Sequence, residues 1–187
     1  MRPFLFFSTA AIIVICDQVS KWAVIANLPV HAERSVIDGF LKLTHTRNSG
    51  GAFSLLQARP EVFIAIAVVA IAALCFAYLR SSRGDLLVSA AIALALGGAI
   101  GNLIDRVRFK YVVDFFDITV NLPLIGRWPV FNVADSAITV GILLLAGHFL
   151  FRRDKAVEEK AAKVEEETNG SQPNPASEQV EHSSPNA

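Results

Sequence analysis

Four long apolar runs constrain the fold of this chain more than any other feature. They lie at about residues 4–25, 62–79, 86–104 and 133–151, in a chain whose residues are 53% hydrophobic. A helix needs roughly 20 predominantly apolar residues to cross the hydrocarbon core of a bilayer. Each run reaches or approaches that length. We therefore predict an all-α membrane protein with four transmembrane helices.

The connections between the runs define the topology. Runs two and three are separated only by RSSRGD, so we expect them to form an antiparallel pair. Both termini then lie on one side of the membrane, and two larger loops, at about residues 26–59 and 106–132, lie on the other. The numbers of Lys and Arg on the two sides do not show which side is cytoplasmic. The short basic segments RSSRG and FRRDK directly flank their spans, which favours cytoplasmic termini.

Charge is divided unevenly along the chain. Residues 1–153 carry 14 Lys and Arg against 9 Asp and Glu, whereas residues 154–187 carry 3 against 8. The acidic segment lacks aromatic residues and is rich in Glu, Ser, Asn and Pro, so it cannot bury enough apolar surface to order itself. We predict a membrane domain at 1–153 and a disordered cytoplasmic tail at 154–187.

The first run could instead be a cleavable signal or a lipoprotein leader that ends at Cys16. Both require a small residue before the cleavage point, and the residue before Cys16 is Ile15. We therefore predict a retained helix. Cys16 and Cys75 lie inside spans and are predicted to be packed thiols, because neither a disulfide nor a metal pair is indicated there.

Ionisable residues inside spans are costly, by at least ~2.5 kcal/mol at the bilayer centre. Asp17 and Lys21 lie four residues apart in the first run, so they share a helix face and could form an ion pair. That pair could anchor the helix at the interface, or it could contact a substrate. The residues leave both alternatives open.

The third run ends in GGAIGNLIDR. Gly97 and Gly101 form a small-xxx-small step that allows close approach of a neighbouring helix. Asn102, Asp105 and Arg106 follow as one stripe at the end of the helix. Taken alone, this is a packing motif followed by an interfacial salt bridge.

The fourth run opens with FNVADSA. Asn132 is a candidate N-cap and Asp135 falls in the first helical turn, where the helix macrodipole favours a carboxylate. Capping would explain this motif by itself. However, the topology brings several polar side chains to the same membrane face: Asp17, Asn102, Asp105, Asp114 and Asp135. So many acids at one end of a small bundle exceed what capping requires.

The first large loop predicts a short β-hairpin or small sheet lying on the membrane. Asp38-Gly39 is a turn signal, and residues 40–46 are rich in strand formers. The following RNSGGAFS segment, which contains Gly50 and Gly51, suits backbone contact with an extended peptide or a plain connecting turn.

Several catalytic schemes are absent from the sequence. The histidines lack HExxH spacing, no GxSxG motif is present, and Ser20 and Lys21 are adjacent and point to different helix faces. A carboxylate pair remains, which needs no metal and no cofactor. Two such groups in a poorly hydrated site share a proton. We expect Asp135, at a helix start, to be ionised and Asp114, between Val113 and Phe115, to be protonated.

Five motifs together resemble the lipoprotein signal peptidase family, bacterial signal peptidase II. They are DQVSK at 17–21, RNSGGAFS at 47–54, GGAIGNLIDR at 97–106, VVDF at 113–116 and FNVADS at 131–136. The resemblance runs in order from about residue 4 to 151. It implies a four-helix inner-membrane aspartic endopeptidase with a small periplasmic sheet and a periplasmic lid loop. Such enzymes cut prolipoproteins N-terminal to a diacylglyceryl-modified cysteine.

The resemblance also implies roles for individual residues. Asp114 and Asp135 would be the catalytic pair. Asp117 has no counterpart role in the family, so we expect it to be a loop charge or a hydrogen-bonding brace. Gly51 replaces an alanine that is frequent in the family. The residues that would bind substrate or brace the site are Asp17, Lys21, Asn48, Gly50, Asn102, Asp105, Arg106, Asn132 and Ala134.

The family further implies a periplasmic active site, cytoplasmic termini, and a lid containing Pro123, Gly126 and Trp128. The expected partners are lipid-modified prolipoproteins and membrane lipids, with no nucleic acid, and the expected state is a monomer. The alternative function is a small transporter or proton channel that uses intramembrane carboxylates. Transporter sites favour the midplane and repeated halves, whereas these acids cluster at one end and the two halves show no repeat.

Overall fold

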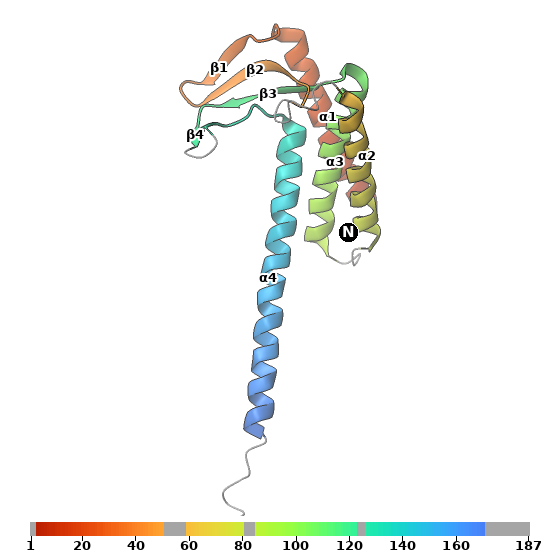
Figure 1. Cartoon of the computed structure of the whole chain (residues 1–187), viewed down its shortest axis with the longest axis vertical. Coiled ribbons are helices and arrows are strands. Elements are labelled where there is room, and N and C mark those ends of the chain that lie inside the picture. The colour runs from red at the N-terminus through yellow and green to blue at the C-terminus, as the bar shows by residue number, and fades with distance from the viewer. Residues whose placement is uncertain (1–2, 51–58, 81–84, 123–125, 171–187) are drawn as a thin grey trace, which may run out of the picture. The chain divides into compact units, whose positions relative to one another are not determined.

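The computed structural model describes residues 3–50, 59–80, 85–122 and 126–170. The described helices are α1 (Pro3–Asn27), α2 (Pro60–Arg80), α3 (Leu86–Phe109) and α4 (Val133–Gly170). The strands are β1 (Glu33–Ile37), β2 (Leu41–Asn48), β3 (Val112–Ile118), β4 (Asn121–Leu122) and β5 (Gly126–Arg127) (Figure 1). All four helices are long and apolar enough to cross a membrane, with the apolar part of α4 at Val133–Phe151, which confirms the prediction of four such helices.

Helix α3 forms the core of the membrane bundle. In the most apolar stretch of α3, 61% of the residues are buried, whereas no residue of α2 is buried. Ile92 and Leu96 of α3 pack against Phe6 of α1, and the Phe6 ring stacks on Tyr78 of α2 with 3.6 Å between ring centroids. The large apolar side chains on the outer faces of α1, α2 and α4 remain exposed, as expected for helices that face lipid.

Glycines allow the helices to approach α3 closely on two sides. A Cβ on Gly97 would lie 2.7 Å from the Ala10 carbonyl oxygen of α1, which confirms the predicted close approach of a neighbouring helix. A Cβ on Gly98 would collide with the Ala134 carbonyl oxygen of α4. Helix α3 therefore brings the polar ends of α1 and α4 together.

Helix α3 is longer than the third apolar run because both of its ends are capped. Asp85 accepts a hydrogen bond from the Val88 N–H at 3.2 Å, and Lys110 ends the helix in a left-handed conformation with φ 68°. The helix extends to Phe109, five residues beyond the predicted end at 104. Asp105 and Arg106 are therefore helical residues.

A three-stranded antiparallel sheet in the order β1-β2-β3 confirms the predicted small sheet. Its β1–β2 turn contains Gly39 at φ +74°, a conformation that favours glycine. Strand β3 comes from the second large loop and places Thr46 opposite Asp114, after a register shift between Leu43 and Thr46. The sheet lies at the end of the bundle where α3 finishes and α4 begins (Figure 1).

The C-terminal part of the chain forms a separate unit. The first compact unit ends at residue 146, and the second begins at residue 147. Within the second unit α4 continues to Gly170, and the disorder expected of the acidic tail stays a prediction. Ala, Glu and Lys dominate this segment, and these residues favour helix even where no core is available. Residues 171–187 lie outside the described part of the chain.

The two cysteines differ from expectation in one respect. Cys16 and Cys75 are free thiols, as predicted, but both are exposed on the surfaces of their helices and are not packed. A small apolar thiol is tolerated at a lipid-facing position, so burial was not required.

Candidate active site

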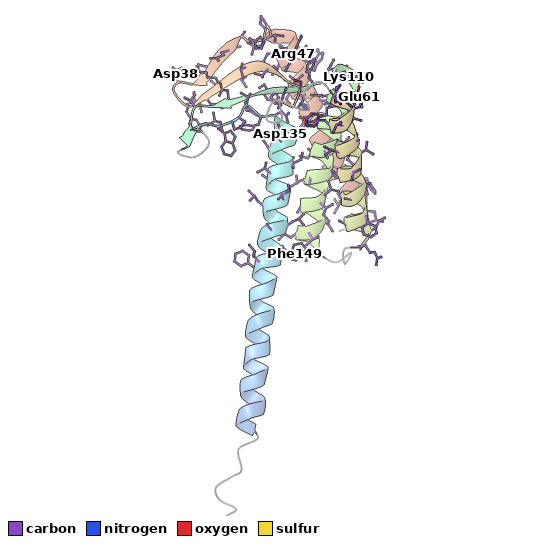
Figure 2. The ribbon with its side chains drawn as sticks, in the orientation of Figure 1. Asp38, Arg47, Glu61, Lys110, Asp135 and Phe149 are labelled. Atoms are coloured by element: carbon purple, nitrogen blue, oxygen red, sulfur yellow. The ribbon has the colours of Figure 1, made fainter. Side chains whose placement is uncertain are left out.

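Asn132 connects two carboxylates that come from different segments. Its side-chain amide donates to Asp114 Oδ1 at 2.7 Å, and its backbone N–H donates to Asp135 Oδ2 at 3.2 Å. Asp114 lies on β3, and Asp135 lies in the first turn of α4, just below the sheet (Figure 2). A single residue therefore holds both acids of the predicted pair.

The start of α4 is a reciprocal cap. Asn132 Oδ1 accepts from the Asp135 N–H at 2.9 Å while Asp135 accepts from the Asn132 N–H, which confirms the predicted N-cap. The local sequence alone sets this arrangement, because it joins residues three apart. The positive end of the helix dipole stabilises negative charge at this position.

Asp114 is buried, with 1% of its surface exposed. Its second oxygen accepts from Asn48 Nδ2 at 2.8 Å, and Asn48 is held in turn by the Gly50 N–H at 2.9 Å. Burial raises the pKa of Asp114 to about 7; the hydrogen bond from Asn48 opposes the rise, and the charge of Asp135 adds to it. Asp114 therefore keeps its proton up to about neutral pH.

Lys21 is a buried cation that interacts electrostatically with Asp114. Its Nζ lies 2.9 Å from Asp17 Oδ2 and 3.0 Å from Asp105 Oδ2, with 2% of the residue exposed. The predicted Asp17–Lys21 ion pair is confirmed, and it is buried inside the bundle. Asp105 pairs across helices with Lys21, which replaces the interfacial pair with Arg106 considered from sequence.

Asn102 connects Lys21 to Asp135 through hydrogen bonds. Its Oδ1 accepts from Lys21 Nζ at 2.9 Å and from Asn132 Nδ2 at 3.2 Å, and its Nδ2 donates to Asp135 Oδ1 at 2.8 Å. Both oxygens of Asp135 thus accept a hydrogen bond. These two hydrogen bonds fix the orientation of the Asp135 carboxylate.

The remaining predicted residues surround the same point. Arg106 donates to the Asn102 carbonyl at 3.4 Å and interacts electrostatically with Asp135, Asp114 and Asp105. Ala134 is fully buried, and its N–H donates to Asp17 Oδ1 at 3.0 Å. Gly50 has φ +97° and leaves no room for a Cβ against the Phe63 ring, so glycine is required there.

Two predicted features fall partly outside the described residues. Gly51 belongs to the segment 51–58, and Pro123 of the lid belongs to 123–125. Gly126 is in β5, which pairs with β4, and Trp128 follows it. Among the residues that the structure describes, no group of His, Cys, Asp and Glu is placed to hold a metal ion.

Asp117 does not join the carboxylate pair. It lies three residues from Asp114 on β3, and residues at that spacing point to opposite faces of a strand. It is 2% exposed, so the prediction of a loop charge is wrong, while a bracing role stays a prediction. It borders a cavity of about 450 Å³ whose other lining residues are His31, Glu33, Thr44, Thr46, Trp128, Pro129 and Val130.

One polar residue of the site was missing from the predicted set. Gln18 Nε2 donates toward Asp17 Oδ2 at 3.1 Å and Asp105 Oδ1 at 3.0 Å. The available signal was an amide inside an apolar run, next to an acid on the same helix. Its partner on α3 could not be known without the helix packing.

The chain is similar to several proteins of one family. A family model described as signal peptidase (SPase) II matches residues 9–151. The chain is 38% identical over 148 residues to a lipoprotein signal peptidase of Syntrophus aciditrophicus strain SB, covering 75% of this chain and 89% of that one. It is 40% identical over 142 residues to a lipoprotein signal peptidase of Bacillus pumilus strain SAFR-032, covering 75% and 90%. A bacterial membrane enzyme structure at 2.3 Å resolution aligns with a TM-score of 0.74 and 32% identity, covering 82% of this chain and 92% of that one.

Proposed function

The chain belongs to the signal peptidase II family, and we propose that it cleaves lipid-modified prolipoproteins with a water activated between Asp114 and Asp135. The cut falls N-terminal to the lipidated cysteine, and the reaction is peptide-bond hydrolysis by an aspartic endopeptidase. The alternative of a transporter or proton channel has no support from the family.

The two acids would divide the work according to their surroundings. Asp135 accepts hydrogen bonds at both oxygens from Asn102 and Asn132, and it acts as the base that takes a proton from water. The water oxygen attacks the scissile carbonyl carbon, and protonated Asp114 gives its proton to the carbonyl oxygen. When the tetrahedral intermediate collapses, the proton held by Asp135 passes to the leaving amine, and the diol proton returns to Asp114.

The charges around the pair support a single shared proton. Only two cations, Lys21 and Arg106, interact with the four acids Asp17, Asp105, Asp114 and Asp135 within the described part of the chain. Ionising Asp114 as well would add a fourth negative charge in a buried setting, which Coulomb repulsion and desolvation oppose.

We further propose that the sheet and the pair face the periplasm and that both termini are cytoplasmic, in the bacterial inner membrane. The even number of spans and the basic segments beside the short turn and the fourth span support this orientation. The acyl chains of the substrate would stay among membrane lipids while the peptide reaches the pair. We propose that the enzyme acts as a monomer.

The observation that carries the proposal is the Asn132 side chain and backbone, which bind one carboxylate each. The test is a gel-shift assay of a lipidated prolipoprotein with purified wild type, Asp114→Asn and Asp135→Asn. Each substitution should lower cleavage at least about a thousandfold, because no second group can replace a missing member of the pair.

Asp38→Asn is the matched control, since it removes one carboxylate in the β1–β2 turn away from the pair. It should cleave at the wild-type rate. Full activity in either variant of the pair would disprove the mechanism. If Asp117→Asn abolished cleavage while Asp114→Asn kept it, Asp117 and not Asp114 would be the catalytic acid of β3.

A further inference from the structure

Gln18 occupies a central position between α1 and α3. Its half-buried amide nitrogen lies 3.1 Å from Asp17 Oδ2, 3.0 Å from Asp105 Oδ1 and 3.1 Å from the Gly101 carbonyl oxygen. A side-chain amide has two N–H groups, so it can serve both carboxylates or share a hydrogen with the carbonyl. Gln18 thus ties the end of α1 to the end of α3.

The two acids that Gln18 contacts each hold the backbone beside one member of the proposed catalytic pair. Asp17 Oδ1 accepts from the N–H of Ala134, the residue before Asp135, at 3.0 Å. Asp105 Oδ2 accepts from the N–H of Val113, the residue before Asp114, at 3.0 Å. The positions of Asp17 and Asp105 therefore determine where both segments of the pair lie.

Asp17 and Asp105 are buried carboxylates that repel each other unless donors stand between them. Two side chains of α1 supply these donors. Lys21 supplies charge at 2.9 Å and 3.0 Å, and Gln18 supplies the hydrogen bond to Asp105 Oδ1. Because Gln18 and Lys21 are three residues apart, they lie on the same helix face.

We propose that Gln18 is a positioning residue that fixes the spacing between Asp114 and Asp135 through Asp17 and Asp105. It does not touch the reacting atoms. The inference rests on the proposed catalytic pair. It adds a residue whose loss would misplace both acids at once.

The first test is Gln18→Leu, which keeps a similar volume and removes the amide. A misplacement of the pair by about 1 Å should lower kcat by about 10- to 100-fold. KM for a lipidated prolipoprotein should stay within about threefold, because ground-state binding is not affected. The matched control is Asn27→Leu, which removes an amide from the same helix. Among the described residues, that amide bonds only the Ala23 carbonyl. Asn27→Leu should keep the wild-type kcat.

The second test is Gln18→Glu, which distinguishes positioning from a loss of fold. The groups that face this position are Asp17 and Lys21 on α1 and Asp105 on α3. A protonated carboxyl can donate one hydrogen bond to these acids, whereas an ionised one donates none and adds repulsion. The ratio of variant kcat to wild-type kcat should therefore rise as the pH is lowered.

Wild-type kcat in Gln18→Leu, or a change confined to KM, would overturn the proposal. A ratio of Gln18→Glu kcat to wild-type kcat that does not depend on pH would also overturn it. If Gln18→Leu does not fold, this pH dependence is the measurement that tests the proposal. Failure of the proposed function would look different, because the wild type itself would then leave every lipidated substrate uncut.

Discussion

At the scale of single residues, two aspartates acquire different properties from their surroundings. Asp114 is buried on a strand between amide donors, whereas Asp135 lies at the positive end of a helix. Burial favours the neutral acid and the helix terminus favours the carboxylate. The chemical asymmetry that the proposed hydrolysis needs would thus follow from where each aspartate is placed.

The raised pKa of Asp114 predicts a cost in stability at neutral pH. In the folded protein this carboxyl keeps its proton up to a pKa of about 7, whereas in the unfolded chain it ionises above about 4. Unfolding therefore releases a proton between these values, and the stability contributed by Asp114 is lost as the pH rises through this window. Asp114→Asn removes the dependence.

Thermal unfolding in detergent at about pH 4.5 and about pH 7.5 tests this. The difference in Tm between Asp114→Asn and wild type should be more positive at the upper pH. The change in this difference should be equivalent to a few kcal/mol. Asp38→Asn, which alters an exposed turn, should show no such trend. An equal Tm difference at both pH values would contradict a raised pKa at Asp114.

Lys21 offers a prediction on buried charge. Lys21→Met leaves Asp17 and Asp105 without their cation, and breaking a buried ion pair typically costs about 3–5 kcal/mol. Lys42→Met is the comparison, because Lys42 pairs with Glu33 at the same 2.9 Å but both side chains are exposed. It should cost about 0–1 kcal/mol. Equal effects on the unfolding midpoint would mean that the Lys21 network does not stabilise the bundle.

At the scale of elements, α3 positions the pair through glycines. Gly98 faces the Ala134 carbonyl of α4, one residue before Asp135, and the added methyl of Gly98→Ala would force α4 away. We expect a loss of about 1–3 kcal/mol from overpacking, together with loss of cleavage as Asp135 moves.

Gly147→Ala is the matched substitution for this prediction, because a Cβ there meets nothing within 4 Å. In a helix interior it should be neutral or stabilising by up to about 1 kcal/mol. Unfolding midpoints and cleavage rates of both variants check the argument. Normal activity in Gly98→Ala would show that α4 can shift without disturbing the pair.

At the scale of the whole molecule, the proposed site and the C-terminal unit occupy separate parts of the sequence. Every residue of the proposed site lies between Asp17 and Asp135, whereas the second compact unit begins at residue 147. A chain that ends at Arg153 keeps the complete fourth span. It should cleave a lipidated prolipoprotein within about twofold of the full-length rate, since exposed terminal segments tolerate truncation. A large loss of activity after this truncation would assign the tail a part in the reaction.

The sequence by itself determined the features that depend on neighbouring residues. Hydropathy located the spans because the cost of burying polar groups in lipid accumulates residue by residue along a helix. The cap formed by Asn132 and Asp135 and the pair of Asp17 with Lys21 were predictable because they join residues three or four apart. The resemblance of five motifs to one family then indicated the acids of the site.

Only the tertiary structure decided which of these groups meet. The bond from Ala134 to Asp17 spans 117 residues, and the bond from Gln18 to Asp105 spans 87. Such contacts depend on how α3 packs and on the pairing of β3 with β2, and periodic patterns do not specify either. The burial that raises the pKa of Asp114 has the same origin, because it is the assembled sheet and bundle that exclude water from this carboxyl.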